Sequence, residues 1–547
     1  DVLLPPFEMA VREGGARSVM NAYTDLDGVP SAADRSLLTE LLRETWGFNG
    51  TVVADYFTIA FLKLLHGTAD TWADAAAAAL EAGIDVELPT VKTFGEPLRR
   101  AVEEGIVDES LVDTALRRVL RQKAELGLLD ADWSPVPLAL AGTDLSQPDA
   151  LRGTIDLDPA ENRALAARLA EQAVVLVRND GTLPLAAPRT IAVIGPNADD
   201  PYAMLGCYSF PAHVVTQHPG VAMGIEIPTV LEALRAEFPG SDIRYAKGTS
   251  VDGGETDGIA DAAALAASAD VVILALGDRA GLFGRGTSGE GCDVESLTLP
   301  GAQQPLVDAV LATGTPTVVT LLTGRPYALR GAATDAAAIV QAFFAGEEGG
   351  PAIAGILSGR VNPSGRLPVS IPATPGSQPT TYLAAPLARA NGVSNVDPTP
   401  AFPFGHGLGY ASFEWDDLQG DGPEAAVDGT VSLSIRVRNT GERRGAEVVQ
   451  LYLHDPVASV VRPVQRLIGF VRLELEPGAE TRVRVRVPAD LTSFTSRTGS
   501  RIVEPGVIEF GFGRSSGDIP LVHRVTLVGA TRVVDHTRAL HPTFELS

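Results

Sequence analysis

The sequence TVVADY at residues 51–56 is a short apolar run that ends in a carboxylate, and a helical pattern follows it at residues 59–65. Similar runs occur at residues 18–23 (SVMNAY) and 84–88 (IDVEL), each before a helical pattern. Strands that alternate with helices indicate βα units around a parallel sheet. A (β/α)8 barrel needs about 250 residues, so three units predict only its C-terminal portion. The alternative, a small three-stranded domain, would leave its parallel strands without cover.

The pattern changes twice further along the chain. Continuous apolar runs such as residues 271–276 and 317–322 are typical of parallel strands buried on both faces, which predicts an α/β sandwich. Short alternating strands separated by turns then predict an all-β sandwich of immunoglobulin or fibronectin type III-like architecture. The expected domains are the barrel portion at 1–135, the α/β sandwich at 160–375 and the β-sandwich at 413–547, with linkers at 136–159 and 376–412.

The amino-acid composition excludes several classes of function. The chain has 547 residues, of which 45% are hydrophobic, and its formal net charge is −25. Such an acidic protein is repelled by phosphate backbones, so we expect no nucleic-acid partner. No run of about eighteen strongly apolar residues occurs, so we expect no membrane span. The two cysteines, Cys207 and Cys292, are too few for a disulfide scaffold and have no clustered metal ligands. We expect an acidic multidomain enzyme.

Asp55 is the first candidate for chemistry, because it stands at the carboxyl end of a predicted parallel strand. Active sites of such folds are built at that end, where a carboxylate can serve as a nucleophile or base. The alternative is a structural Asp that caps the following helix. Asn21 and Tyr23 lie at the end of the neighbouring strand, and the Tyr23 phenol could bind a carboxylate and orient it.

Glu290 is the second candidate, within the glycine-rich loop GRGTSGEGCD at residues 284–293. The loop lacks the G-K-[ST] ending of a phosphate-binding loop. Glycines would let it deliver Glu290 far from its own domain as a general acid. The alternative is a solvated acidic loop. Glu87, at the end of the third strand, ranks below Glu290 as a partner for Asp55, because such carboxylates are often structural.

Several longer motifs resemble glycoside hydrolase family 3 β-glycosidases. They span nearly the whole chain in the family's order of barrel, α/β sandwich and fibronectin type III-like domain. The motifs are VMNAY and VVADY (19–23 and 52–56), AGIDVELP (82–89), AVVLVRNDGTLPL (173–185), SGEGCDVESLTLPG (288–301), GGPAIAGILSGRVNPSGRLPVSIP (349–372), FPFGHGLGY (402–410) and VRNTGERRGAEVVQLYLHD (437–455).

The resemblance implies an exo-acting retaining β-glycosidase with no metal or redox cofactor, of β-glucosidase or β-xylosidase type. Asp55 looks like the nucleophile and Glu290 like the acid/base. Tyr56 stands where many β-glucosidases have Trp. The two cysteines lie in segments that resemble active-site loops, and we expect free thiols. The substrate-binding residues implied are Met20, Tyr23, Tyr56, Ser209 and Arg285.

The family's cationic sugar ligands and its Asp that reads O4 and O6 belong to the first half of the barrel, which this sequence lacks. We therefore expect a second polypeptide, or an N-terminal segment, that completes the barrel. The substrate would be a small carbohydrate ending in β-D-glucose or β-D-xylose. Alternatives are a non-catalytic carbohydrate-binding fragment and an N-acetylhexosaminidase-type member. A cytoplasmic location is favoured, with secretion and homo-oligomerisation left open.

Overall fold

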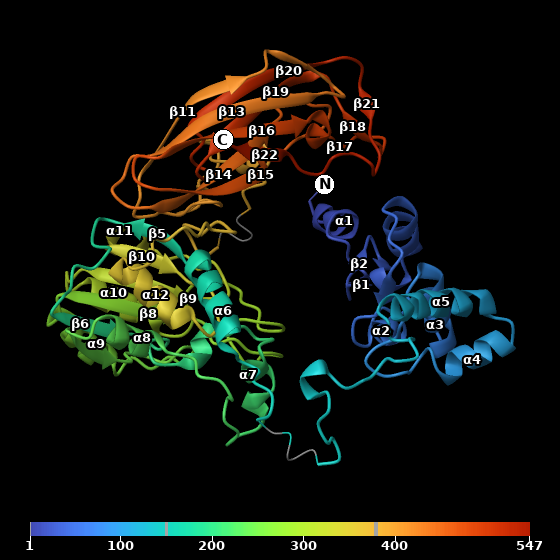
Figure 1. The fold of residues 1–547 in the computed structure, drawn as a ribbon, viewed down its shortest axis with the longest axis horizontal. Coiled ribbons are helices and arrows are strands. Elements are labelled where there is room, and N and C mark those ends of the chain that lie inside the picture. The colour runs from blue at the N-terminus through green and yellow to red at the C-terminus, as the bar shows by residue number, and fades with distance from the viewer. Residues whose placement is uncertain (1, 148–150, 152, 377–380) are drawn as a thin grey trace. The chain divides into compact units, whose positions relative to one another are not determined.

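The computed structural model describes residues 2–147, 151, 153–376 and 381–547 (Figure 1). The chain divides into two compact units. Unit 1 consists of Asp1–Ile155 together with Asp535–Leu540, and unit 2 consists of Asp156–Val534 with His541–Ser547. Among the described residues, no helix combines the length and apolar character needed to cross a bilayer. The domain boundaries inferred from the sequence stay a prediction.

Unit 1 is built on neighbouring parallel strands. β1 (Ser18–Met20) pairs with β4 (Thr51–Val53) so that Met20 lies opposite Val53, and Val53 forms a parallel bridge with Val86. Consecutive strands therefore lie side by side, as expected for successive βα units of a barrel. The segment at residues 84–88 contributes a single bridge rather than the full strand predicted. The other elements are α1 (Pro5–Arg12), β2 (Asp25–Leu26), β3 (Val29–Pro30), the π-helix Ser36–Thr45, α2 (Thr58–Leu64), α3 (Trp72–Ala82), α4 (Glu96–Glu103) and α5 (Glu109–Glu125).

The core of unit 1 forms where α2 and α3 cover this sheet. Val52 and Ile84 are fully buried and pack in one cluster with Leu62 of α2 and with Ala75, Ala79 and Ala82 of α3. Helix α3 begins at a capping box, in which Thr71 and Asp74 each accept the other's backbone N–H. This cap satisfies two donors that a helix start leaves open, and the small alanines let α3 approach the sheet closely. The carboxyl end of β4 is thereby fixed in place.

The first part of unit 2 is a three-layer α/β sandwich (Figure 1). Its six-stranded sheet has the order β5-β10-β9-β8-β6-β7, parallel except for the β5–β10 pair. One face packs against α6, α8 and α12, and the other against α9, α10 and α11. The strands are β5 (Val175–Asn179), β6 (Thr190–Ile194), β7 (Asp242–Ala246), β8 (Val271–Gly277), β9 (Thr317–Leu322) and β10 (Ala338–Gln341). The helices are α6 (Ala160–Ala173), α7 (Phe210–His213), α8 (Val230–Glu237), α9 (Ile259–Ala267), α10 (Gln303–Leu311), α11 (Ala332–Asp335) and α12 (Gly349–Ser358).

The remainder of unit 2 is a β-sandwich. Its two main sheets have the orders β11-β13-β16-β22 and β12-β20-β19-β14-β15, and their inward side chains form one apolar core. The predicted fold class of barrel portion, α/β sandwich and fibronectin type III-like sandwich is confirmed. The strands are β11 (Phe413–Gly420), β12 (Glu424–Ala426), β13 (Thr430–Asn439), β14 (Gly445–His454), β15 (Arg466–Leu475), β16 (Glu480–Pro488), β17 (Phe494–Thr495), β18 (Arg501–Val503), β19 (Gly506–Gly513), β20 (Leu521–Val528), β21 (Arg532–Val533) and β22 (Thr543–Leu546).

His406 joins the FPFGHGLGY segment to the α/β sheet. Its Nε2 lies 2.8 Å from the carbonyl oxygen of Val177 in β5, and its ring stacks on Phe402. A carbonyl only accepts, so Nε2–H is the donor. Burial lowers the pKa of His406 below its ordinary value of 6.5, with a smaller contribution from the charge of Arg366, although the Val177 carbonyl opposes the shift.

We predict that His406 makes unit 2 less stable in acid. The unfolded chain binds a proton on this residue at a higher pH than the folded chain does, so stability falls as pH drops below about 6.5. In thermal melts between pH 8 and pH 5, His406→Gln should lose part of this decline, because glutamine keeps a donor but does not titrate. The exposed His218 provides the control. Identical slopes for the His406→Gln and His218→Gln variants would contradict the prediction.

Candidate active site

Asp55 lies two residues after β4, with one carboxylate oxygen held by two donors. The Tyr23 hydroxyl is 2.8 Å from Asp55 Oδ1, and the backbone N–H of Tyr56 is 2.7 Å from the same atom. The predicted hydrogen bond from Tyr23 is confirmed. The Tyr23 hydroxyl also lies 2.9 Å from the Tyr56 carbonyl. A phenol has one proton, and a bond to the charged carboxylate is the stronger of the two.

The backbone around Asp55 is fixed from both sides. Ala54 N–H donates to Val86 O and Phe57 N–H donates to Leu88 O, both at 2.9 Å. Phe57 has a φ of +66°, in the left-handed region that is uncommon for a non-glycine residue. The chain thus turns sharply directly after Asp55, and α2 begins at Thr58. The half-buried Asp55 carboxylate is therefore presented at the strand end with little freedom.

Met20 and Tyr56 lie close to Asp55 along these strand ends. Met20 is the last residue of β1 and is 58% exposed, and Tyr56 is 55% exposed. Large apolar side chains that stay exposed at the carboxyl ends of parallel strands are available to contact a ligand. Asn21 has a different place, because its buried amide binds the Ala22 carbonyl and the Thr58 hydroxyl. It holds the turn and does not bind Asp55 in the structure.

Glu87 has a structural environment. Its carboxylate accepts the backbone N–H groups of Lys92, Thr93 and Phe94 and the hydroxyl of Thr93, at 2.8–3.0 Å. Four donors occupy the lone pairs that a reacting carboxylate must offer. The low rank given to Glu87 as a catalytic residue agrees with this geometry.

Glu290 lies on an extended loop that follows β8. The loop folds back on itself, because Gly281 N–H donates to Ser288 O and Phe283 N–H donates to Glu290 O, at 2.9 and 2.8 Å. Gly289, with a φ of +129°, permits this fold: a Cβ atom there would lie 2.0 Å from the Gly281 carbonyl oxygen. The Glu290 side chain is exposed. A glycine on each side allows the chain to present it outward.

Tyr208 is a site residue that the sequence analysis did not identify. Its hydroxyl donates to Glu290 Oε2, and its ring packs edge-on against His213, with centroids 5.6 Å apart. The signal available was its place directly before Ser209 in LGCYSF. Ser209 itself accepts the N–H of Ala212 and caps the short helix α7. Its proposed contact with substrate stays a prediction.

The remaining predicted residues of unit 2 have simple environments. Arg285 is exposed, and its Nε donates to Leu282 O at 3.3 Å. Cys207 and Cys292 are free, as predicted. In the described part of the chain, no group of three or more His, Cys, Asp or Glu side chains has a metal-binding arrangement. Asp55 belongs to unit 1 and Glu290 to unit 2, so each half of the candidate site is described within its own unit.

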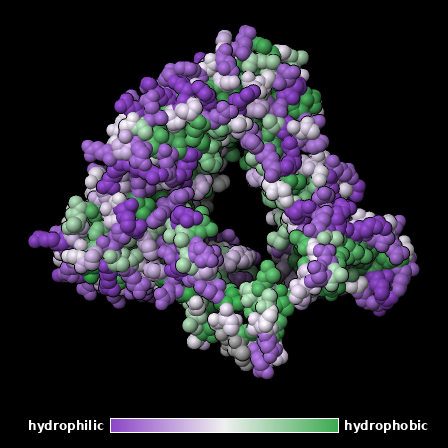
Figure 2. All heavy atoms as spheres, in the orientation of Figure 1, coloured by the Kyte–Doolittle hydropathy of each residue, from purple (hydrophilic) through white to green (hydrophobic). Residues whose placement is uncertain are grey.

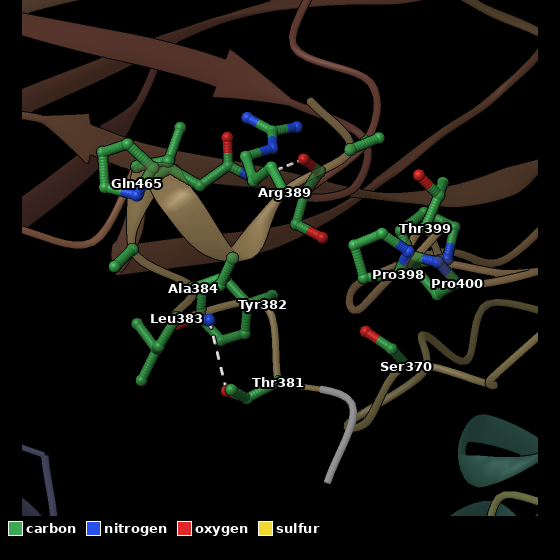
Figure 3. Close-up of a pocket in the computed structure, with 18 of the residues that line it drawn as sticks. Ser370, Thr381, Tyr382, Leu383, Ala384, Arg389, Pro398, Thr399, Pro400 and Gln465 are labelled. Carbon is green, nitrogen blue, oxygen red and sulfur yellow. Dashed lines mark hydrogen bonds between the residues drawn. The ribbon is translucent and has the colours of Figure 1, made fainter. Parts of the chain in front are cut away.

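Unit 2 also contains a cavity of about 1380 Å³ between the 381–400 segment and the β-sandwich (Figure 3). Tyr382 lies on one side and Pro398 and Pro400 on the other. The Tyr382 ring stacks on Phe404 with centroids 4.1 Å apart, so that face is covered. None of the predicted site residues lines this cavity.

Comparison with known proteins identifies the family to which the chain belongs. Residues 1–122 match the glycosyl hydrolase family 3 N-terminal domain, residues 174–410 its C-terminal domain, and residues 447–516 a fibronectin type III-like domain. A β-xylosidase of Formosa agariphila is 34% identical over 538 residues, covering 94% of this chain and 70% of the relative. The chain belongs to glycoside hydrolase family 3. It is therefore an enzyme that hydrolyses O-glycosyl bonds.

Other members of family 3 show the same relationship. The periplasmic β-glucosidase of Salmonella typhimurium is 33% identical, over 94% of this chain and 68% of the relative. The crystal structure of a β-glucosidase from Listeria innocua in complex with glucose matches with a TM-score of 0.84 at 29% identity, covering 96% of this chain and 69% of that one. A β-glucosidase from Erythrobacter marinus matches with a TM-score of 0.82 at 35% identity, with 96% and 69% covered.

Proposed function

We propose that this family 3 enzyme is an exo-acting retaining β-glycosidase that releases a terminal non-reducing β-D-glucose or β-D-xylose. The observation that carries the proposal is the environment of Asp55. Among the described residues, both hydrogen bonds to its carboxylate reach Oδ1, which leaves Oδ2 for attack on a sugar. A carboxylate with one oxygen anchored and the other available suits nucleophilic catalysis.

The reaction proceeds in two displacements. Asp55 Oδ2 attacks the anomeric carbon while the Glu290 carboxyl gives its proton to the departing glycosidic oxygen, so that a covalent glycosyl-enzyme forms and the aglycone leaves. Glu290, now ionised, takes a proton from water, whose oxygen displaces Asp55. Each step inverts the anomeric centre, so the product retains its configuration. The two carboxyls must approach to about 5–5.5 Å for this mechanism.

Two sugars remain candidates for the terminal residue. Similar proteins are named both β-xylosidase and β-glucosidase, and one related structure contains glucose. The sugars differ by the hydroxymethyl group at C5. A panel of nitrophenyl β-xyloside, β-glucoside and α-arabinofuranoside distinguishes them.

We predict that Asp55→Asn abolishes covalent labelling by a 2-fluoro glycoside and lowers kcat by about 10⁴–10⁶-fold, as loss of a nucleophile does in other hydrolases. Intact-protein mass spectrometry measures the label. Glu87→Gln is the matched control, because that carboxylate is on the adjacent strand end but is bound by loop donors. The control should still be labelled. Labelling of the Asp55→Asn variant at another residue would refute the assignment.

We predict that Glu290→Ala lowers kcat by about 10²–10⁴-fold on glycosides with poor leaving groups. Dinitrophenyl glycosides should be affected less, because their leaving group scarcely needs a proton. Azide should restore turnover of such activated substrates, giving a β-glycosyl azide. Glu295→Ala, at an exposed position five residues along the chain, serves as the control and should behave as wild type. Equal losses on both substrate classes, without azide rescue, would argue against the acid/base role.

We also propose that further βα units, from a preceding segment or a second polypeptide, pack against unit 1. Within the described residues β1 pairs with β4 alone, so its other edge is open. Large apolar side chains of unit 1 are also exposed. Figure 2 colours the residues of one face of the molecule by hydropathy. The exposed side chains include Met20, Leu64, Leu65, Val91, Leu116, Leu120 and Trp133. Open edges and apolar surface favour association.

We predict that residues 1–547 produced alone are inactive and aggregate. Co-expression with about five βα units of the family's barrel should give a monodisperse, active complex. Size-exclusion chromatography with light scattering and a nitrophenyl glycoside assay measure both properties. A monodisperse, active 547-residue monomer would contradict this proposal and leave the assignments of Asp55 and Glu290 intact.

A further inference from the structure

Arg325 reaches the loop that carries Glu290 from a neighbouring strand. It lies three residues after β9, in the sequence TGRP. One guanidinium nitrogen donates to the carbonyl of Thr287 and another to the carbonyl of Cys292. These carbonyls lie three residues before and two residues after Glu290. A single planar side chain thus links the two arms of the loop.

Asp278 fixes the base of the same loop. Its side chain is fully buried, and it accepts the Thr287 hydroxyl at 2.7 Å, the Tyr327 hydroxyl at 2.6 Å and the Gly324 N–H at 2.8 Å. Burial and the charge of Asp278 raise the pKa of the Tyr327 phenol, so it stays a donor. The segment after β9 is therefore joined to the start of the loop by Asp278 and to its end by Arg325.

Arg325 and Asp278 add to the backbone hydrogen bonds that already join the two arms of the loop, from Gly281 N–H to Ser288 O and from Phe283 N–H to Glu290 O. Five glycines occur between residues 281 and 291, and each has more backbone freedom than other residues. Glu290 is exposed, so close packing does not hold its backbone in place. The guanidinium supplies several donors in a fixed plane, which matches two carbonyls at once, whereas a lysine ammonium is a point charge.

We infer that Arg325 is a positioning residue for the acid/base, holding the Glu290 backbone where its carboxyl can reach the glycosidic oxygen. This inference rests on the proposed role of Glu290. A displacement of about 1 Å in a reacting group can cost about 10²-fold in rate. Removal of the guanidinium should therefore slow the first displacement on substrates whose leaving group needs a proton, and slow it far less where the leaving group does not.

The test compares Arg325→Met and Arg325→Lys with Arg178→Met in the active enzyme, prepared with the further βα units proposed above. Arg178 is a matched control, since its Nε also donates to a backbone carbonyl, Ala336 O at 2.7 Å, away from the loop. We expect Arg325→Met to lower kcat/KM, which reports the first displacement, by about 10²-fold on methoxyphenyl glycosides but far less on dinitrophenyl glycosides. Arg325→Lys should recover part of the loss. The control should show no dependence on the leaving group.

Three outcomes decide the inference. A loss for Arg325→Met that is equal on both substrates, or no loss, overturns it while Glu290→Ala still shows leaving-group dependence. If Glu290→Ala lacks that dependence, the proposed acid/base role fails and the inference with it. If Arg325→Met does not fold, Arg325→Lys is judged by the same rate ratio, with thermal melts to verify folding.

Discussion

A buried carboxylate must accept hydrogen bonds on its oxygen atoms. Each unit of this enzyme is organised around one buried carboxylate whose oxygens do so. In unit 1 the Asp85 side chain is fully buried and binds Arg43 at 2.6 Å, Arg118 at 3.0 Å and the N–H of Val52 at 2.8 Å. Breaking such a cluster by removing one partner costs about 3–5 kcal/mol, because a charge is left uncompensated. Val52 is a residue of β4, so the strand that presents Asp55 depends on this cluster. In unit 2 the buried Asp278 carboxylate has the same role and also accepts three hydrogen bonds.

The number of donors around a carboxylate separates structural from reactive groups in this molecule. Among the described residues, Asp85 and Glu87 each have three or more donors, whereas two donors reach Asp55, both at one oxygen. A saturated carboxylate is a poor nucleophile, because attack requires it to give up hydrogen bonds worth about 1.5–3 kcal/mol each. The sequence alone places Asp55 and Glu87 at neighbouring strand ends. The hydrogen bonds distinguish them.

The continuous apolar strands were predictable because burial on both faces leaves a clear pattern. The run at residues 317–322 has the same bounds as β9, and the run at 271–276 ends one residue before β8 does. β7 was missed because DIRYA, at the sheet edge, alternates polar and apolar residues and is only partly buried. Asp55 and Glu290 could be singled out by position and resemblance. Arg325 could not, since its importance depends on which loops the fold brings together and nothing in TGRP indicates that; for Tyr208 the signal was its place directly before Ser209 in LGCYSF.

The two proposed catalytic carboxylates are held in position in different ways. Asp55 is attached to a strand end whose backbone bonds to the next strand, and rigid elements hold side chains more accurately than loops do. Glu290 is on a glycine-rich loop, which allows it to extend outward but provides no intrinsic rigidity. A loop-borne acid can therefore be accurate only if cross-links replace the missing sheet. The bonds of Arg325 to two carbonyls of the loop and of Asp278 to the Thr287 hydroxyl are such cross-links, and they would fix the path of the loop without occupying the glutamate carboxyl.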